Sequence, residues 1–163
     1  MKITCYDIKK SKQNSPELIK QKDVGCDSSP MDTPGKIADF VTYMLGAKDF
    51  LEERTHVIAL SASGKILGIF QVGQGTSTAC MVGSKEVFSR LIAINATAFV
   101  ITHNHPSGKI TPSNNDIELT RKLLEAGKVL DIPCLDHIIT GDGSNYFSFK
   151  ESGIIEKLKG GKY

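Results

Sequence analysis

The chain has 163 residues, which is enough for one domain with a hydrophobic core that needs no metal or disulfide support. Its net charge of +2 is far from the strongly basic balance of a dedicated DNA-binding domain. The four cysteines are scattered without a Cys-x-x-Cys pair, which argues against a cysteine zinc site and a disulfide framework. No apolar run approaches membrane-spanning length, so we expect a cytoplasmic protein that does not associate with membranes.

The first part of the chain is polar, lysine-rich and interrupted by prolines. We therefore expect residues 1–32 to form a weakly structured arm. Thr33 as an N-cap and Pro34 in the first turn then predict a helix that ends at Gly46. This helix would open a single domain over residues 33–159, followed by a frayed tail at 160–163.

Strands and helices alternate through the rest of the chain. Two β-branched runs at 55–62 and 65–73, separated by Ser63-Gly64, predict a hairpin. Further strands are expected at 97–102, at 134–140 and over the Tyr-Phe-Ser-Phe segment, with helices from Ser84, from Ser113 and over 150–159. This order predicts a single-domain α/β sandwich with a mixed central sheet flanked by helices.

The segment THNHPSGKITPSNND, residues 102–116, contains two of the four histidines. His103 and His105 alternate at a strand end, so both side chains project to one side while Asn104 points away. Asp116, in the first turn of the next helix, could supply a third ligand. Two imidazoles, one carboxylate and a water form the open site of a catalytic zinc. The alternative is a polar loop in which Asp116 only closes a capping box with Ser113.

The same residues resemble a known motif. The spacing of four residues is similar to the JAMM (JAB/MPN) metalloprotease motif: His103 and His105 are separated by one residue, seven residues then precede Ser113, and two more precede Asp116. The strings HNHPSG, PSNNDIELT and LDHII resemble the RadC branch of that family. This resemblance implies a JAB/MPN-like fold, one Zn²⁺ per chain and a metal-activated water that cleaves an amide, peptide or isopeptide bond in a protein or peptide substrate.

The family also uses an upstream glutamate as general base. Glu52 and Glu53 immediately precede a predicted strand, where the residues alone favour a solvated loop or helix end. The resemblance favours Glu53 as the base and implies that Ser113 stabilises the oxyanion. Asn104, Asp136 and His137 are candidates for supporting the ligands. His137 is expected to be a core or supporting residue rather than a fourth ligand.

A second function, from a different class, is a DNA- or protein-binding module with little or no catalytic activity. Relatives in the RadC branch are associated with DNA repair, but residues 1–34 do not resemble the helix-hairpin-helix region that begins longer members. The lysine-rich arm is the only candidate DNA contact in the sequence; its lysines are Lys9, Lys10, Lys12, Lys20 and Lys22. An edge strand near this arm could support a homodimer.

Overall fold

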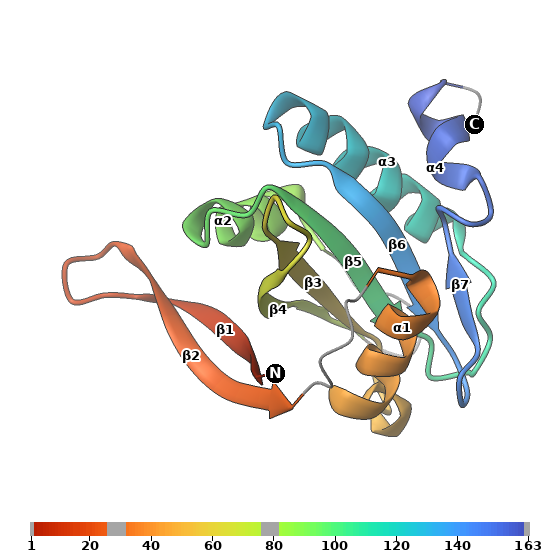
Figure 1. The fold of residues 1–163 in the computed structure, drawn as a ribbon, viewed down its shortest axis with the longest axis horizontal. Helices are drawn as coiled ribbons and strands as arrows, with labels where there is room; N and C mark the ends of the chain where they lie inside the picture. The colour runs from red at the N-terminus through yellow and green to blue at the C-terminus, as the bar shows by residue number, and fades with distance from the viewer. Residues whose placement is uncertain (1, 26–31, 76–81, 162–163) are drawn as a thin grey trace.

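A computed structural model of the chain describes residues 2–25, 32–75 and 82–161. Its strands form one seven-stranded sheet in the order β2-β1-β4-β3-β5-β6-β7 (Figure 1). The strands are β1 (Lys2–Lys10), β2 (Pro16–Gly25), β3 (Arg54–Leu60), β4 (Ile66–Gln74), β5 (Ala98–Asn104), β6 (Cys134–Thr140) and β7 (Tyr146–Ser148). The helices are α1 (Pro34–Asp39), which continues as a π-helical turn over Phe40–Met44, a 3-10 turn (Ala47–Asp49), α2 (Ser84–Ala93), α3 (Asn114–Val129) and α4 (Ile154–Lys159).

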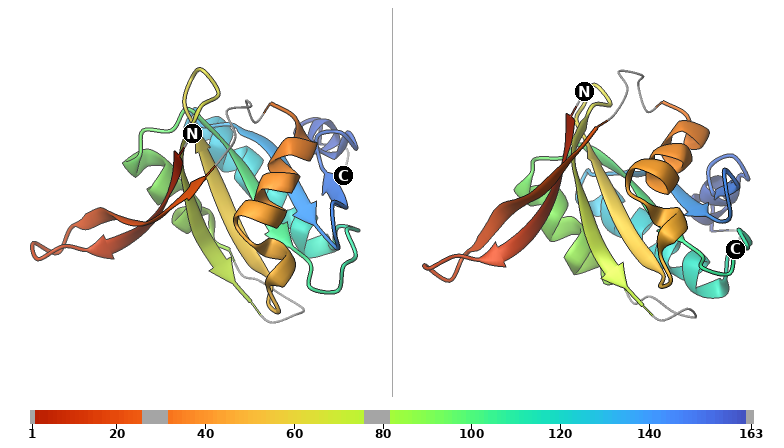
Figure 2. Two further views of the ribbon diagram at one scale, coloured as in Figure 1. Left: turned by 60° about the horizontal axis from the view of Figure 1, so that its bottom comes forward. Right: turned by 90° about the horizontal axis from the view of Figure 1, so that it is seen from below.

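The sheet is mixed and is covered on both faces. β1 pairs with β4 and β5 with β6 in parallel, while the other neighbours are antiparallel. Helix α1 covers one face, and α2 and α3 cover the other (Figure 2). In β5, Val100 joins the core under α1, whereas Phe99 and Ile101 join the core under α2 and α3. The predicted α/β sandwich is confirmed, and this alternation decides which face each later residue of β5 reaches.

The expectation of a weakly structured arm at the amino terminus was wrong for the described residues. β1 and β2 form an antiparallel hairpin that projects from the body of the domain (Figures 1 and 2). Ile3 and Val24 are buried at its base, and β1 continues the sheet through Cys5 and Tyr6, which pair with β4. Alternating apolar residues and a turn with Asn14 at φ 69° explain the hairpin, a pattern hidden by the high lysine content.

Most local signals are confirmed. The Thr33 side chain accepts a hydrogen bond from the backbone N–H of Lys36, and Gly64 adopts a φ of 74° in the β3–β4 turn. Helix α2 has Gly83 at its N-cap, so Ser84 is its first residue rather than its cap. Helix α4 begins at Ile154, four residues later than expected. Among the described residues, no helix is long and apolar enough to cross a membrane.

Candidate metal centre

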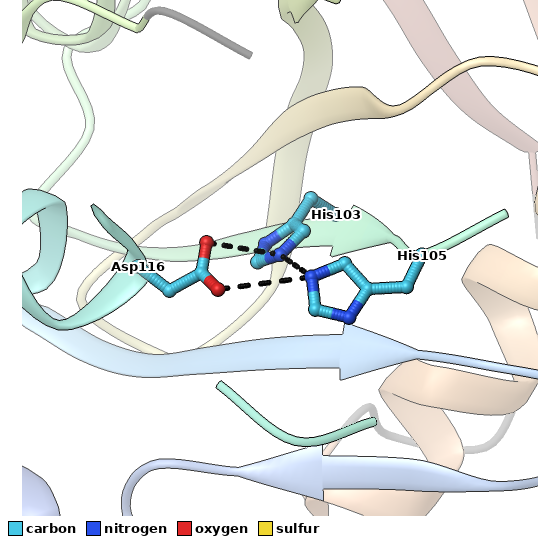
Figure 3. A group of neighbouring side chains, drawn as sticks. All are labelled: His103, His105 and Asp116. Carbon is cyan, nitrogen blue, oxygen red and sulfur yellow. Dashed lines mark hydrogen bonds and ion pairs between the residues drawn. The ribbon is translucent and has the colours of Figure 1, made fainter. Parts of the chain in front are cut away.

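His103, His105 and Asp116 meet at the end of β5 and the start of α3 (Figure 3). The Nε2 atoms of the two histidines are 3.0 Å apart. Asp116 Oδ1 lies 3.2 Å from His103 Nε2, and Asp116 Oδ2 lies 3.7 Å from His105 Nε2. One ligand atom from each residue lies within 4.8 Å of the others, so a single cation could contact all three.

Helix α3 orients the carboxylate of Asp116. Ser113 is its N-cap, and its hydroxyl accepts a hydrogen bond from the Asp116 backbone N–H at 3.2 Å. In return, Asp116 Oδ2 accepts hydrogen bonds from the Ser113 backbone N–H and hydroxyl, each at 2.7 Å. The two interpretations of Asp116 are therefore compatible, because Oδ2 closes the capping box while Oδ1 faces His103.

The tautomer of His105 follows from its hydrogen bond to a backbone carbonyl. Its Nδ1 lies 2.7 Å from the carbonyl oxygen of Lys109, which can only accept, so Nδ1 carries the proton. Nε2 is then the atom that faces Asp116 and His103. The hydrogen bond with Asp116 raises the pKa of His105, although burial opposes this effect. Nε2 can therefore hold a proton that a metal ion would displace.

A buried chain of hydrogen bonds orients His103 in the same way. The Thr120 hydroxyl donates to the Asp116 carbonyl at 2.6 Å, so it must accept from His137 Nδ1–H at 2.7 Å. Burial lowers the pKa of His137 well below its usual value, leaving its Nε2 without a proton. That atom accepts from His103 Nδ1–H at 2.8 Å. His103 therefore presents an unprotonated Nε2 to the site, the form that binds metal.

Burial and charge around the three residues suit a divalent cation. His103 is only 1% exposed, and burial lowers its pKa to about 4, so it is neutral at pH 7. Burial tends to raise the pKa of Asp116, but hydrogen bonds from His105 and Ser113 keep it well below its usual value. Two imidazole nitrogens and an ionised carboxylate oxygen thus converge, with no fourth protein ligand among the described residues. This donor set fits zinc with one open position.

The structure distinguishes Glu53 from Glu52. Glu53 is half-buried, and burial together with the negative charge of Asp116 raises its pKa, while His105 lowers it. Its carboxyl group therefore lies within electrostatic reach of the candidate metal ligands. The Glu52 side chain is exposed and accepts a hydrogen bond from Gln74 Nε2 instead. Of the two glutamates, Glu53 is therefore the one whose carboxyl group lies near the candidate metal ligands.

Asn104 and Asp136 lie on the opposite face of the sheet from the metal ligands. The Asn104 carboxamide accepts from the Arg54 backbone N–H at 2.9 Å and donates to the Glu52 carbonyl at 3.1 Å. The buried Asp136 carboxylate accepts from the Ser148 hydroxyl at 2.6 Å and from two backbone N–H groups. Asn104 thus fixes the backbone of the segment that contains Glu53, and the Asp136 side chain on β6 connects this strand to β7 through its hydrogen bond with Ser148. Neither reaches the cation position.

Two supporting residues were not recognised in the sequence. Thr120 follows Asp116 by one helical turn, a spacing that could have marked it as a neighbour. Gly141 is closely packed: a Cβ atom there would lie 2.3 Å from the Gly108 carbonyl oxygen. The loop that contains His105 is therefore held against the turn after β6.

The fold and the site together define an α/β domain with a candidate metal centre between a central strand and the following helix. Residues 31–154 match the family described as RadC-like JAB domain, and the chain belongs to this family. The resemblance noted in the sequence is confirmed.

Curated relatives of the chain have names that describe no activity. It is similar to UPF0758 protein STH371 of Symbiobacterium thermophilum, with 45% identity over 63% of the chain and 44% of that relative. It is 38% identical to a UPF0758 protein of Desulfitobacterium hafniense over 77% of the chain and 54% of that relative. A UPF0758 protein of Trichlorobacter lovleyi is 41% identical over 76% and 52%. The matched region thus spans about half the length of these relatives.

Proposed function

We propose that the chain is a zinc-dependent metallohydrolase of the JAMM type that cleaves amide, peptide or isopeptide bonds. The observation that supports this most directly is the convergence of His103 Nε2, His105 Nε2 and Asp116 Oδ1, with the half-buried carboxyl of Glu53 nearby. A zinc ion held there would lower the pKa of a bound water and polarise a carbonyl group.

Two side chains of the chain would carry out proton transfer and stabilise the oxyanion in this reaction. Glu53 would accept the proton of the attacking water and later deliver it to the leaving amine, a role that suits a carboxyl group whose pKa is raised. Ser113 would stabilise the oxyanion. Its hydroxyl donates to Asp116 in this structure, so it would have to turn toward the substrate to do so.

Metal analysis tests the first half of the proposal. Protein purified without chelator should contain stoichiometric zinc, and His103→Ala and Asp116→Ala should lose it. If the wild-type protein holds no stoichiometric metal even after reconstitution with zinc, the proposal fails.

Hydrolysis tests the second half. Glu53→Gln should retain the metal but lose cleavage of a peptide and isopeptide panel, because an amide cannot accept the proton. Glu52→Gln is the matched control, since this side chain bonds Gln74, and it should retain activity. A Glu53→Gln protein as active as the wild type would exclude Glu53 as the base.

A DNA-binding role would use the projecting hairpin. Lys9, Lys10 and Lys12 lie at or near its tip and are exposed, so phosphate groups could contact them. Because β1 is part of the sheet, substitution of these lysines by glutamine is a cleaner test than deletion of the hairpin. Salt-dependent DNA binding that disappears in this variant supports the role. No binding at low salt removes it.

A further inference from the structure

A polar pocket of about 480 Å³ lies between the amino-terminal hairpin, strands β3 and β4, and the segment after α1. His56 and Arg54 line it from β3, and Lys22 lines it from β2. His56 pairs with Thr102, whereas the neighbouring pair Thr55–His103 contains the metal ligand. The pocket therefore opens on the face of β3 opposite the metal centre.

Arg54 contributes a positive charge that has no ion-pair partner among the described residues. Its guanidinium lies over the Phe50 ring, 4.1 Å from the ring centroid, and it makes no ion pair with a described carboxylate. Its Nε is buried and lacks a hydrogen-bond acceptor there. A buried donor on a charged group without an acceptor is costly, and a bound anion would supply one.

The ring of His56 is a second polar group with no hydrogen-bond partner among the described residues. The residue is only 7% exposed, and its ring stacks against Phe50 at a centroid distance of 6.3 Å. Burial, together with the charges of Arg54 and Lys22, lowers its pKa to about 4. At pH 7 its neutral ring can donate one N–H to a ligand.

Among the described residues, the lining contains one acidic residue, Asp7, which already interacts with other groups. Asp7 Oδ1 accepts from the Ile8 backbone N–H at 2.8 Å and lies 4.0 Å from Arg90. Leu45 and Ile69 add apolar surface to the same pocket. The pocket thus combines an uncompensated positive charge, a neutral donor and an apolar wall.

We propose that this pocket binds a small carboxylate that has an apolar portion. The planar guanidinium of Arg54 matches a carboxylate through two parallel hydrogen bonds, and the ring of Phe50 holds it in place. His56 donates to the same carboxylate, and Leu45 and Ile69 contact the apolar portion. The site is independent of the proposed hydrolase activity, because none of these side chains is a metal ligand.

Benzoate and benzamide, which have the same shape but differ in charge, are the probes. NMR titration of the 163-residue chain should show saturable shifts of the His56 ring and Arg54 Nε–H signals with benzoate, and binding of benzamide should be at least about tenfold weaker. Equal binding of the two probes, or the absence of saturable shifts with benzoate, would overturn the proposal. Inorganic phosphate that binds more tightly than benzoate would overturn the choice of a carboxylate.

Variants connect the binding to Arg54. Arg54→Gln should weaken benzoate binding by at least about tenfold, whereas Arg121→Gln, on the surface of α3, should leave it unchanged. Lys22→Gln alters an exposed side chain that lines the pocket, and should weaken binding severalfold. Benzoate affinities equal to wild type in both pocket variants contradict the proposal.

Discussion

Asn104 holds the backbone on both sides of Glu53 through two hydrogen bonds. Its amide oxygen and nitrogen bond Arg54 N–H and the Glu52 carbonyl, fifty and fifty-two residues earlier in the chain. Its neighbour His103 projects to the other face of the sheet as a candidate metal ligand. The end of β5 thus positions a ligand and the proposed base together.

Asn104→Ala should affect the position of the proposed base, Glu53, without affecting the metal ligands. Loss of two hydrogen bonds to partly buried backbone groups should lower the free energy of unfolding by about 1–3 kcal/mol. The zinc content should remain near wild type, the Arg54 amide should exchange faster with solvent, and hydrolysis should fall. Zinc loss as complete as in His103→Ala would show that Asn104 supports the metal ligands themselves.

Thr120→Val should weaken metal binding although Thr120 is not a ligand. The valine removes the hydroxyl that accepts from His137, so His103 loses the hydrogen bonds that keep its proton on Nδ1. A competition titration with a chromophoric chelator should show about 10–100-fold lower zinc affinity. Thr120→Ser retains the hydroxyl and should bind zinc like the wild type. Equal affinities for the valine and serine variants would refute this chain of hydrogen bonds.

His56 should make the stability of the domain sensitive to acid. In the unfolded chain, His56 has its usual pKa of 6.5, whereas in the folded domain its pKa is about 4. The unfolded state therefore binds more protons between these values, so stability is full above pH 6.5 and falls as the pH drops toward 4. The contribution lost at pH 5 is about 2 kcal/mol. Urea unfolding of wild type and His56→Phe at pH 7 and pH 5 measures this difference, and equal pH dependence would contradict it.

Gly141→Ala should disturb the metal centre from a distance. The new methyl group would meet the Gly108 carbonyl oxygen at 2.3 Å, so the loop that contains His105 and Lys109 must move. We expect about 1–3 kcal/mol lower stability and weaker zinc binding, measured by thermal unfolding and zinc titration. Gly143→Ala is a suitable control, because a methyl group there would have no neighbouring atom within 4 Å. The φ of 61° at Gly143 adds some strain to this variant. An unchanged zinc affinity in Gly141→Ala would contradict this prediction, because it would show that the loop accommodates the methyl group without moving His105.

The sequence alone determined the features that depend on neighbouring residues. The capping box of Ser113 and Asp116 and the helix start at Thr33 follow from short-range hydrogen bonds. The alternation of His103 and His105 follows from the period of a strand. These patterns were sufficient to predict the α/β fold and a candidate metal site, and the resemblance to the RadC branch placed them in the correct family.

Only the tertiary structure decided which distant residues meet. The pairing of β3 with β5 brings Glu53 close to Asp116 and places Asn104 against its backbone. The packing of α3 on β6 joins Thr120 to His137. The amino-terminal hairpin required a partner strand, which composition does not reveal. Local periodicity contains no information about the register between strands far apart in the sequence, and that register assembles the site and the pocket behind it.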